Sequence, residues 1–230
     1  MRYDKIRSLT MHPFEQIEIA CKSIKNDTKF HNGYNAIGLS QGALLLRGLA
    51  QTCPFPKMKN FISFGGPQQG IYQANPQTIK IMCTTIHYQL NALIYSRPSQ
   101  YLLTPASYWH DLNPNRYQKG STFLAIINNE KDTIITDYAE NLKALERFVM
   151  VKYESDEAII PNESTFFGYW SEQKTLIRLE ESELYKRDKL GLKAMNENGQ
   201  LVFLVSPGGH LELNEEWFVD NILQYLINTS

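Results

Sequence analysis

The sequence predicts an α/β fold, with a mostly parallel sheet covered by helices on both faces. Apolar strand-like segments at 34–37, 60–64, 148–151 and 201–205 are separated by helical segments, the pattern of a buried parallel sheet. The first of these strands runs through a glycine-bounded turn directly into a helical segment. A chain of 230 residues is long enough for one large core. We therefore expect a single domain over residues 1–230.

Composition excludes several classes of function. Lys and Arg total 23 and Asp and Glu total 24, so the net charge is −1, and no basic run indicates a nucleic-acid partner. No segment reaches the roughly 20 apolar residues that span a bilayer. The first 14 residues, MRYDKIRSLTMHPF, lack the apolar region of a secretory signal. The three cysteines lack the paired spacing of a zinc site, and we expect neither a metal nor a cofactor.

The helical segments follow from apolar periodicity and from prolines. An amphipathic pattern predicts a helix at 13–25, and a second helix follows the first strand until Cys53-Pro54-Phe55-Pro56 ends it. Further helices are expected near 77–94, at 137–147 and at 216–227. The pattern from about 67 to 145 is less regular, and the stretch near 77–94 is interpreted as an insertion rather than another βα repeat.

Ser40 is the first candidate for chemistry. A strand, then Gly38-Leu39-Ser40-Gln41-Gly42, then a helix is the nucleophile elbow of α/β hydrolases. The tight turn requires small residues two positions before and after the serine, which Gly38 and Gly42 supply. Unpaired amides at the helix start stabilise a developing oxyanion, and the amide of Gln41 is the expected donor. The alternative is a glycine-rich turn that only packs.

The general base is expected at His210. This histidine directly follows strand 201–205, at the sheet edge where it could reach Ser40. His110 follows no strand and is interpreted as half-buried in an aromatic loop. His87 falls within a helical pattern and is interpreted as structural.

The acid is expected at Asp156, in the loop after strand 148–151. The order serine, acid, histidine is that of α/β hydrolases, and the acid would orient the histidine without taking its proton. Glu154 and Glu157 are rivals in the same loop, and a solvated acidic turn is the structural alternative.

Several stretches together resemble the palmitoyl-protein thioesterases. They are GYNAIGLSQGALLLRG, NFISFGGPQQG, YWHD, NLKALERFVMVK, FGY, LYKRDKLGLKAM, GQLVF and HLELNEEWF. The resemblance spans roughly residues 13–227 and implies an α/β-hydrolase fold with Ser40, Asp156 and His210 as the triad. It also implies a lysosomal enzyme that removes long-chain fatty acyl groups from cysteines of S-acylated proteins or peptides. The 67–145 insertion would help form the acyl groove.

The resemblance also interprets the cysteines and the glycosylation motifs. Cys21 and Cys53 match positions that pair in the family, whereas Cys83 matches a cysteine whose partner is missing and is expected to be a free thiol. The sequons at Asn26, Asn162 and Asn228 are acceptors for N-linked glycans only if the chain enters the secretory pathway.

Family members carry a signal peptide, several strands and a His-Gly-rich loop before the helix expected at 13–25. No counterpart is visible in this sequence, so we expect an N-terminally truncated domain that lacks one oxyanion donor. Three interpretations remain open: a working thioesterase, a catalytically impaired paralogue that binds acyl chains or partners, and a lipase or esterase acting on oxygen esters.

Overall fold

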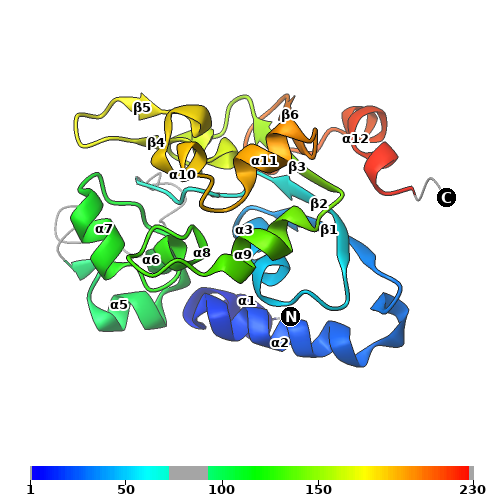
Figure 1. The fold of residues 1–230 in the computed structure, drawn as a ribbon, viewed down its shortest axis with the longest axis horizontal. Helices are drawn as coiled ribbons and strands as arrows, with labels where there is room; N and C mark the ends of the chain where they lie inside the picture. The colour runs from blue at the N-terminus through cyan, green and yellow to red at the C-terminus, as the bar shows by residue number, and fades with distance from the viewer. Residues whose placement is uncertain (1, 73–92, 228–230) are drawn as a thin grey trace.

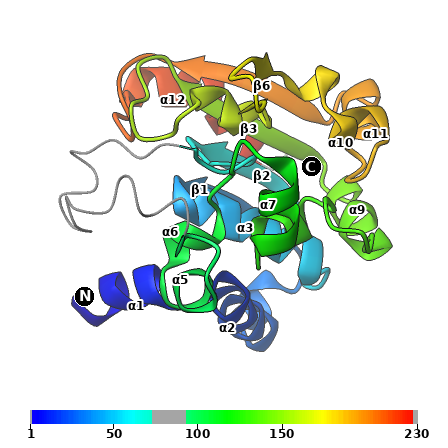
Figure 2. The same ribbon diagram turned by 90° about the vertical axis from the view of Figure 1, so that its left-hand side faces the viewer.

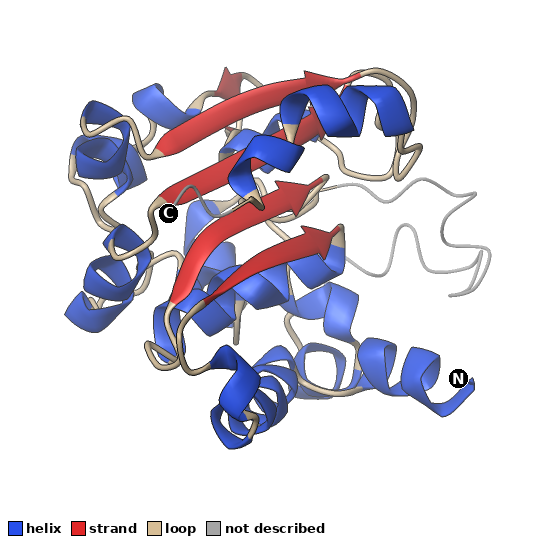
Figure 3. Ribbon diagram, turned by 90° about the vertical axis from the view of Figure 1, so that its right-hand side faces the viewer, coloured by secondary structure: helices blue, strands red, loops and turns tan. Residues whose placement is uncertain are grey.

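A four-stranded parallel sheet forms the centre of the molecule in a computed structural model that describes residues 2–72 and 93–227 (Figure 1). The strands lie in the order β1-β2-β3-β6, and their arrowheads point to the same end of the molecule (Figure 3). Their bounds are β1 (Tyr34–Leu39), β2 (Met58–Phe64), β3 (Arg147–Tyr153) and β6 (Leu201–Ser206). A short antiparallel pair, β4 (Tyr169–Trp170) and β5 (Leu176–Ile177), lies apart from this sheet.

The sheet separates two apolar cores, because successive side chains of a strand point to opposite faces. On one face, Phe61 and Phe148 stack with their ring centroids 4.8 Å apart beneath the larger core. On the other face, Ile62 and Val149 are paired in register and belong to a smaller core. Helices cover both faces, which confirms the predicted fold class.

The larger core is covered by α2, α3, α9 and α11, and the smaller one by α12 (Figure 1). The helices are α1 (Arg2–Thr10), α2 (Pro13–Asn26), α3 (Gln41–Thr52), α5 (Arg97–Leu102), α6 (Thr104–Ser107), α7 (Pro114–Gly120), α8 (Leu124–Ile127), α9 (Thr136–Lys143), α10 (Glu183–Lys186), α11 (Leu192–Glu197) and α12 (Glu215–Asn221). The 3-10 helices are η1 (Thr28–Phe30), η3 (Asn162–Phe166), η4 (Leu179–Glu181) and η5 (Leu223–Tyr225). None of the described helices is long and apolar enough to cross a bilayer.

Two predicted helices end earlier than expected. The helix expected at 137–147 ends at Lys143, because the amide of Glu146 donates to the carbonyl of Lys59 (2.8 Å) and the next residue already belongs to β3. The helix expected at 216–227 breaks after Asn221, where Ile222 is buried in the smaller core. The helix expected near 77–94 lies almost entirely outside the described residues.

Helices α5 to α8 follow β2, and α5 and α6 lie beside α1 (Figure 2). The hydroxyl of Thr104 in α6 donates to the carbonyl of Met11 (2.8 Å), just beyond α1. Residues from the region predicted as an insertion therefore pack against the N-terminal helix near the strand ends.

Candidate active site

Ser40 occupies a sharp turn between β1 and α3. Its φ and ψ angles are 51° and −125°, a conformation that non-glycine residues rarely adopt and that functional sites often contain. The amide of Ser40 donates to the carbonyl of Phe64 at the end of β2 (2.8 Å), which fixes the turn to the neighbouring strand. The turn has the strand-to-helix geometry expected of a nucleophile elbow.

The two glycines of the elbow differ in what surrounds them. A Cβ atom at Gly38 would lie 2.4 Å from the Cα of Ala43, so the close approach of strand and helix requires glycine there. At Gly42 a Cβ atom would meet no atom of the described residues within 4 Å apart from its chain neighbours and the adjoining helix backbone. Packing against neighbouring segments among the described residues therefore requires glycine at Gly38 and does not require it at Gly42.

Ser40, His210 and Asp156 lie in one chain of hydrogen bonds. His210 Nε2 lies 2.9 Å from Ser40 Oγ, and His210 Nδ1 lies 2.8 Å from Asp156 Oδ2. Asp156 Oδ1 accepts the amides of Ala158 (2.8 Å) and Ile159 (3.0 Å), which hold the carboxylate in place. The structure thus brings the three predicted residues together in the order that proton transfer through histidine requires.

The rival residues lie elsewhere. Glu154 and Glu157 are exposed, whereas Asp156 is buried beside the histidine. His110 is buried between the rings of Tyr117 and Tyr169, with its Nδ1 2.8 Å from the carbonyl of Gln69. Burial lowers the pKa of His110 below its usual value, so its neutral form is favoured. His87 is outside the described residues.

Sequence reasoning missed two residues that surround His210. Gly65, which follows β2, has φ +54°, and a Cβ atom there would lie 3.1 Å from both the His210 ring and the Tyr153 ring. The Tyr153 ring packs edge-on against His210 with centroids 6.0 Å apart. Burial, with a smaller contribution from Asp156, raises the pKa of Tyr153 to about 12, so its hydroxyl stays protonated. Gly65 directly follows the apolar strand at 60–64, and this position was the signal in the sequence that could have identified it.

The buried side chain of Arg47 connects α3 to neighbouring segments of the chain. The Arg47 guanidinium donates to the side-chain oxygen of Asn128 (2.7 Å) and to the carbonyls of Gln68 (3.1 Å) and Ile127 (3.3 Å). Burial lowers its pKa to about 9, which still leaves it charged at neutral pH. The helix that begins at the elbow is therefore fixed to the segments that follow β2.

A disulfide joins Cys21 of α2 to Cys53 at the end of α3, as the resemblance implies. The two cysteines are 32 residues apart, and closing a loop of that length stabilises a domain by about 4 kcal/mol in the chain-entropy model. Such a bond persists in an oxidising compartment. Cys83 is outside the described residues.

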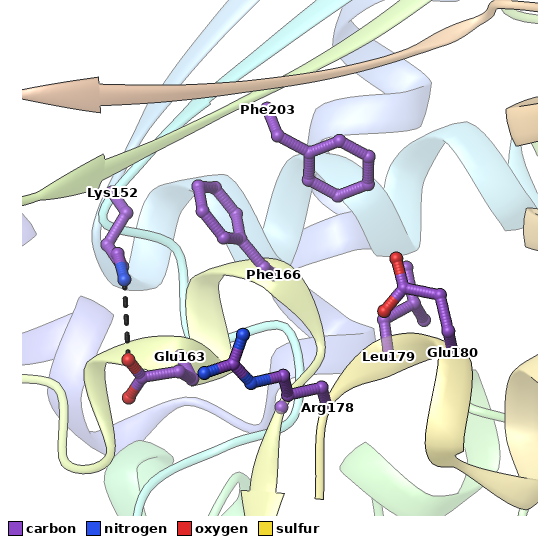
Figure 4. A pocket seen from close by; sticks show the side chains of 8 residues that line it. Lys152, Glu163, Phe166, Arg178, Leu179, Glu180 and Phe203 are labelled. Atoms are coloured by element: carbon purple, nitrogen blue, oxygen red, sulfur yellow. Dashed lines mark hydrogen bonds and ion pairs between the residues drawn. The ribbon is translucent and has the colours of Figure 1, made fainter.

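A cavity of about 300 Å³ lies beside β3 and β6, but none of the three hydrogen-bonded residues lines it (Figure 4). Lys152 and Glu163 form an ion pair of 3.3 Å at its rim, and the rings of Phe166 and Phe203 meet edge to face. We assign no role to this cavity. The described residues also contain no cluster of His, Cys, Asp and Glu that could hold a metal ion.

A parallel sheet with an elbow serine hydrogen-bonded to a histidine and, through it, to an aspartate is the arrangement of an α/β hydrolase. The family model described as Palmitoyl protein thioesterase matches residues 1–210. Palmitoyl-protein thioesterase 1 of Caenorhabditis elegans is 40% identical over 215 residues, which cover 91% of this chain and 72% of the relative. Palmitoyl-protein thioesterase 3 of Dictyostelium discoideum is 33% identical, over 93% of this chain and 75% of the relative.

The Lysosomal thioesterase PPT2 homolog of Drosophila melanogaster is 34% identical over 187 residues, covering 79% of this chain and 64% of the relative. The chain therefore belongs to the palmitoyl protein thioesterase family, a family of thioester hydrolases. This confirms the resemblance drawn from the sequence.

Proposed function

We propose that the chain hydrolyses long-chain fatty acyl thioesters on cysteines of proteins or peptides, with Ser40 as the nucleophile. The observation that carries the proposal is the chain of hydrogen bonds from Ser40 through His210 to Asp156, in a chain of this family. A serine hydroxyl is a weak nucleophile until a base removes its proton, and His210 Nε2 lies within reach of that proton.

The reaction proceeds in two halves. Ser40 Oγ attacks the acyl carbonyl carbon while His210 takes the hydroxyl proton, and the resulting oxyanion is stabilised by the amide of Gln41. The carbon–sulfur bond then breaks, and the proton on His210 passes to the departing cysteine thiolate. This leaves the acyl group on Ser40 as an oxygen ester.

Water completes the cycle. His210 takes a proton from a water molecule, whose oxygen attacks the acyl-enzyme carbonyl. Collapse of the second oxyanion breaks the bond to Ser40 Oγ and returns the proton to it, so the fatty acid leaves and the enzyme is regenerated. Asp156 holds the histidine ring in the required orientation throughout and stabilises its charged form.

We assign the groove for the acyl chain to the segment between β2 and β3, residues 67–145. The names of relatives support an acyl substrate, since they are thioesterases for palmitoylated proteins. Part of this segment, including α5 and α6, lies beside α1 (Figure 2), and the Ser8 carbonyl of α1 accepts a hydrogen bond from the side chain of Gln41, the residue after Ser40.

The test measures release of palmitate from a palmitoyl-cysteine peptide and from a matched palmitoyl-serine peptide. The wild type should hydrolyse the thioester faster than the oxygen ester, and Ser40→Ala should lose both activities. Equal release by the wild type and Ser40→Ala would refute the proposal. Faster cleavage of the oxygen ester would assign the chain to esterases, and a folded but inactive wild type would assign it to binding.

We further propose that the protein works in the lysosome and carries an N-linked glycan at Asn26. Relatives include proteins named lysosomal thioesterases. The disulfide supports passage through an oxidising compartment, where such bonds form and persist. Asn26 is exposed at the end of α2. At the second sequon, Ser164 is buried and its hydroxyl donates to the carbonyl of Gly70 (2.6 Å). Asn228 is outside the described residues.

Glycosylation can be tested in eukaryotic cells with a cleavable secretory leader in front of the chain. Digestion with an N-glycosidase should lower the mass of the wild type and of Asn162→Gln, and should leave Asn26→Gln unchanged. A mass shift that survives in Asn26→Gln and disappears in Asn162→Gln would contradict the choice of site.

A further inference from the structure

The side chain of Gln41 is held at both of its polar atoms. Its Nε2 donates to the backbone carbonyl of Ser8 in α1 (2.8 Å), and its Oε1 accepts the hydroxyl of Tyr108 (3.2 Å). These two hydrogen bonds, here called the Gln41 clasp, join three segments that are far apart in the sequence: α1, the start of α3, and the end of the α5–α6 region.

Both partners of the clasp are themselves anchored. Gln16 Nε2 and Thr104 Oγ1 each donate to the carbonyl of Met11 (both 2.8 Å), which holds the end of α1 against α2 and α6. Tyr108 is buried, and its backbone carbonyl accepts the amide of Ile71 (3.1 Å). Both segments that the clasp joins to Gln41 are therefore held in place by further hydrogen bonds.

Gln41 lies in the backbone where the strained residue Ser40 leads into the first turn of α3. It follows Ser40, whose φ of 51° is strained, and it is the first residue of α3, where the amide has no partner within the helix. The Ser40 side chain makes no capping hydrogen bond to the helix, and its hydroxyl lies 2.9 Å from His210 Nε2.

Hydrogen bonds hold the backbone before and within this turn. The amide of Ser40 donates to the carbonyl of Phe64 (2.8 Å), and the carbonyl of Ser40, in the peptide unit that it shares with Gln41, accepts the amide of Ala43 (3.0 Å). The amide of Gln41 lies at the other end of the same peptide unit, next to the side chain that the clasp holds. A strained conformation persists only where its surroundings over-determine it.

We propose that the Gln41 carboxamide is a positioning group, which fixes the backbone amide of Gln41 toward the oxyanion through Ser8 and Tyr108. This inference rests on the proposed hydrolase function and goes beyond it, because it assigns a role to a side chain that touches no reacting atom. Preorganised donors stabilise a transition state because they do not reorganise during the reaction.

The test compares three variants on the full chain. Tyr108→Phe removes only the hydroxyl that donates to Gln41, Gln41→Met removes both hydrogen bonds at similar volume, and the double variant combines them. Tyr95→Phe is the matched control, because it also removes a tyrosine hydroxyl from this region, one that donates to the carbonyl of Trp109 (3.1 Å). Measured quantities are kcat, KM, the pH profile, thermal unfolding and hydrogen exchange of the Gln41 amide.

Losing a complete oxyanion donor lowers kcat by about 10²- to 10³-fold, so a loosened donor should cost less. We expect kcat to fall about 3- to 10-fold in Tyr108→Phe and about 10- to 30-fold in Gln41→Met, with KM and the pH profile unchanged. The double variant should match Gln41→Met, because both changes act through the same clasp. Exchange of the Gln41 amide should accelerate in all three and remain unchanged in Tyr95→Phe.

The outcomes separate this inference from the proposed function. An active wild type with unchanged kcat and unchanged Gln41 exchange in Tyr108→Phe would overturn the clasp and leave the function standing. A wild type without Ser40-dependent hydrolysis would refute the function, and Gln41 exchange alone would then decide on the clasp. Equal losses of kcat in Tyr108→Phe and Tyr95→Phe, in step with stability, would also overturn it.

Discussion

Ser40 Oγ lies 2.9 Å from His210 Nε2, although the two residues are 170 positions apart in the chain. The parallel sheet produces this contact, because the carboxyl ends of β1 and β6 lie at the same edge and the loop after β6 crosses the edge to reach the elbow. The contact connects the fold to the proposed chemistry.

Replacing each of the two elbow glycines by alanine should change the stability of the protein by different amounts. Gly38→Ala places a methyl group against the backbone of Ala43, and we expect it to lower the free energy of unfolding by about 2 kcal/mol or more. Gly42→Ala meets open space within a helix and should leave stability unchanged or raise it by up to ~1 kcal/mol. Denaturant unfolding of both variants checks this, and equal losses would show that the elbow is packed differently.

Asp156 should be the only acidic residue of its loop that matters for turnover. Asp156→Asn keeps an oxygen for the amides of Ala158 and Ile159 but no longer stabilises a charged His210, so kcat should fall about 10³- to 10⁴-fold. Glu154→Gln and Glu157→Gln, at exposed positions, serve as controls and should change kcat less than about twofold. A large loss in Glu157→Gln with full activity in Asp156→Asn would reassign the acid.

Buried His110 should make the protein less stable in acid. Burial lowers its pKa in the folded state, so as the pH falls below about 6.5 the unfolded chain binds a proton before the folded chain does. The stability present above that pH is lost on acidification, by up to ~1.4 kcal/mol per pH unit until the folded-state pKa is reached. Part of the loss should disappear in His110→Asn, which removes the titrating group and can still donate to the carbonyl of Gln69.

Denaturant unfolding between pH 7.5 and 5 measures this effect. The slope of unfolding free energy against pH should be shallower in His110→Asn than in the wild type. A residual slope is expected because burial also lowers the pKa of His12. Parallel curves for the two proteins would show that His110 does not titrate in the way its environment implies.

Local sequence patterns predicted the four core strands. The same patterns predicted where Ser40, Asp156 and His210 lie relative to those strands. Each depends on local patterns, since a continuous apolar strand is easily recognised and the residue after it lies at the sheet edge. The disulfide between Cys21 and Cys53 came from the family resemblance, because spacing alone does not determine pairing.

The features that were missed depend on contacts between distant segments. Nothing near Gln41 in the sequence indicates that Ser8 and Tyr108 bind its side chain. The early end of α9 depends on a hydrogen bond from Glu146 to Lys59 of β2, which no helical periodicity reveals. The difference between Gly38 and Gly42 likewise depends on what packs against each glycine in three dimensions.

In the proposed mechanism Ser40 becomes acylated during turnover. The decisive experiment mixes the protein with a palmitoyl-cysteine peptide, quenches the reaction in acid within milliseconds to seconds, and maps palmitoylated peptides by mass spectrometry. We expect a palmitoyl group on Ser40 that appears before free palmitate accumulates, and no adduct in Ser40→Ala. Palmitate release at the wild-type rate by Ser40→Ala, or an acyl group on a different residue of the active protein, would contradict it.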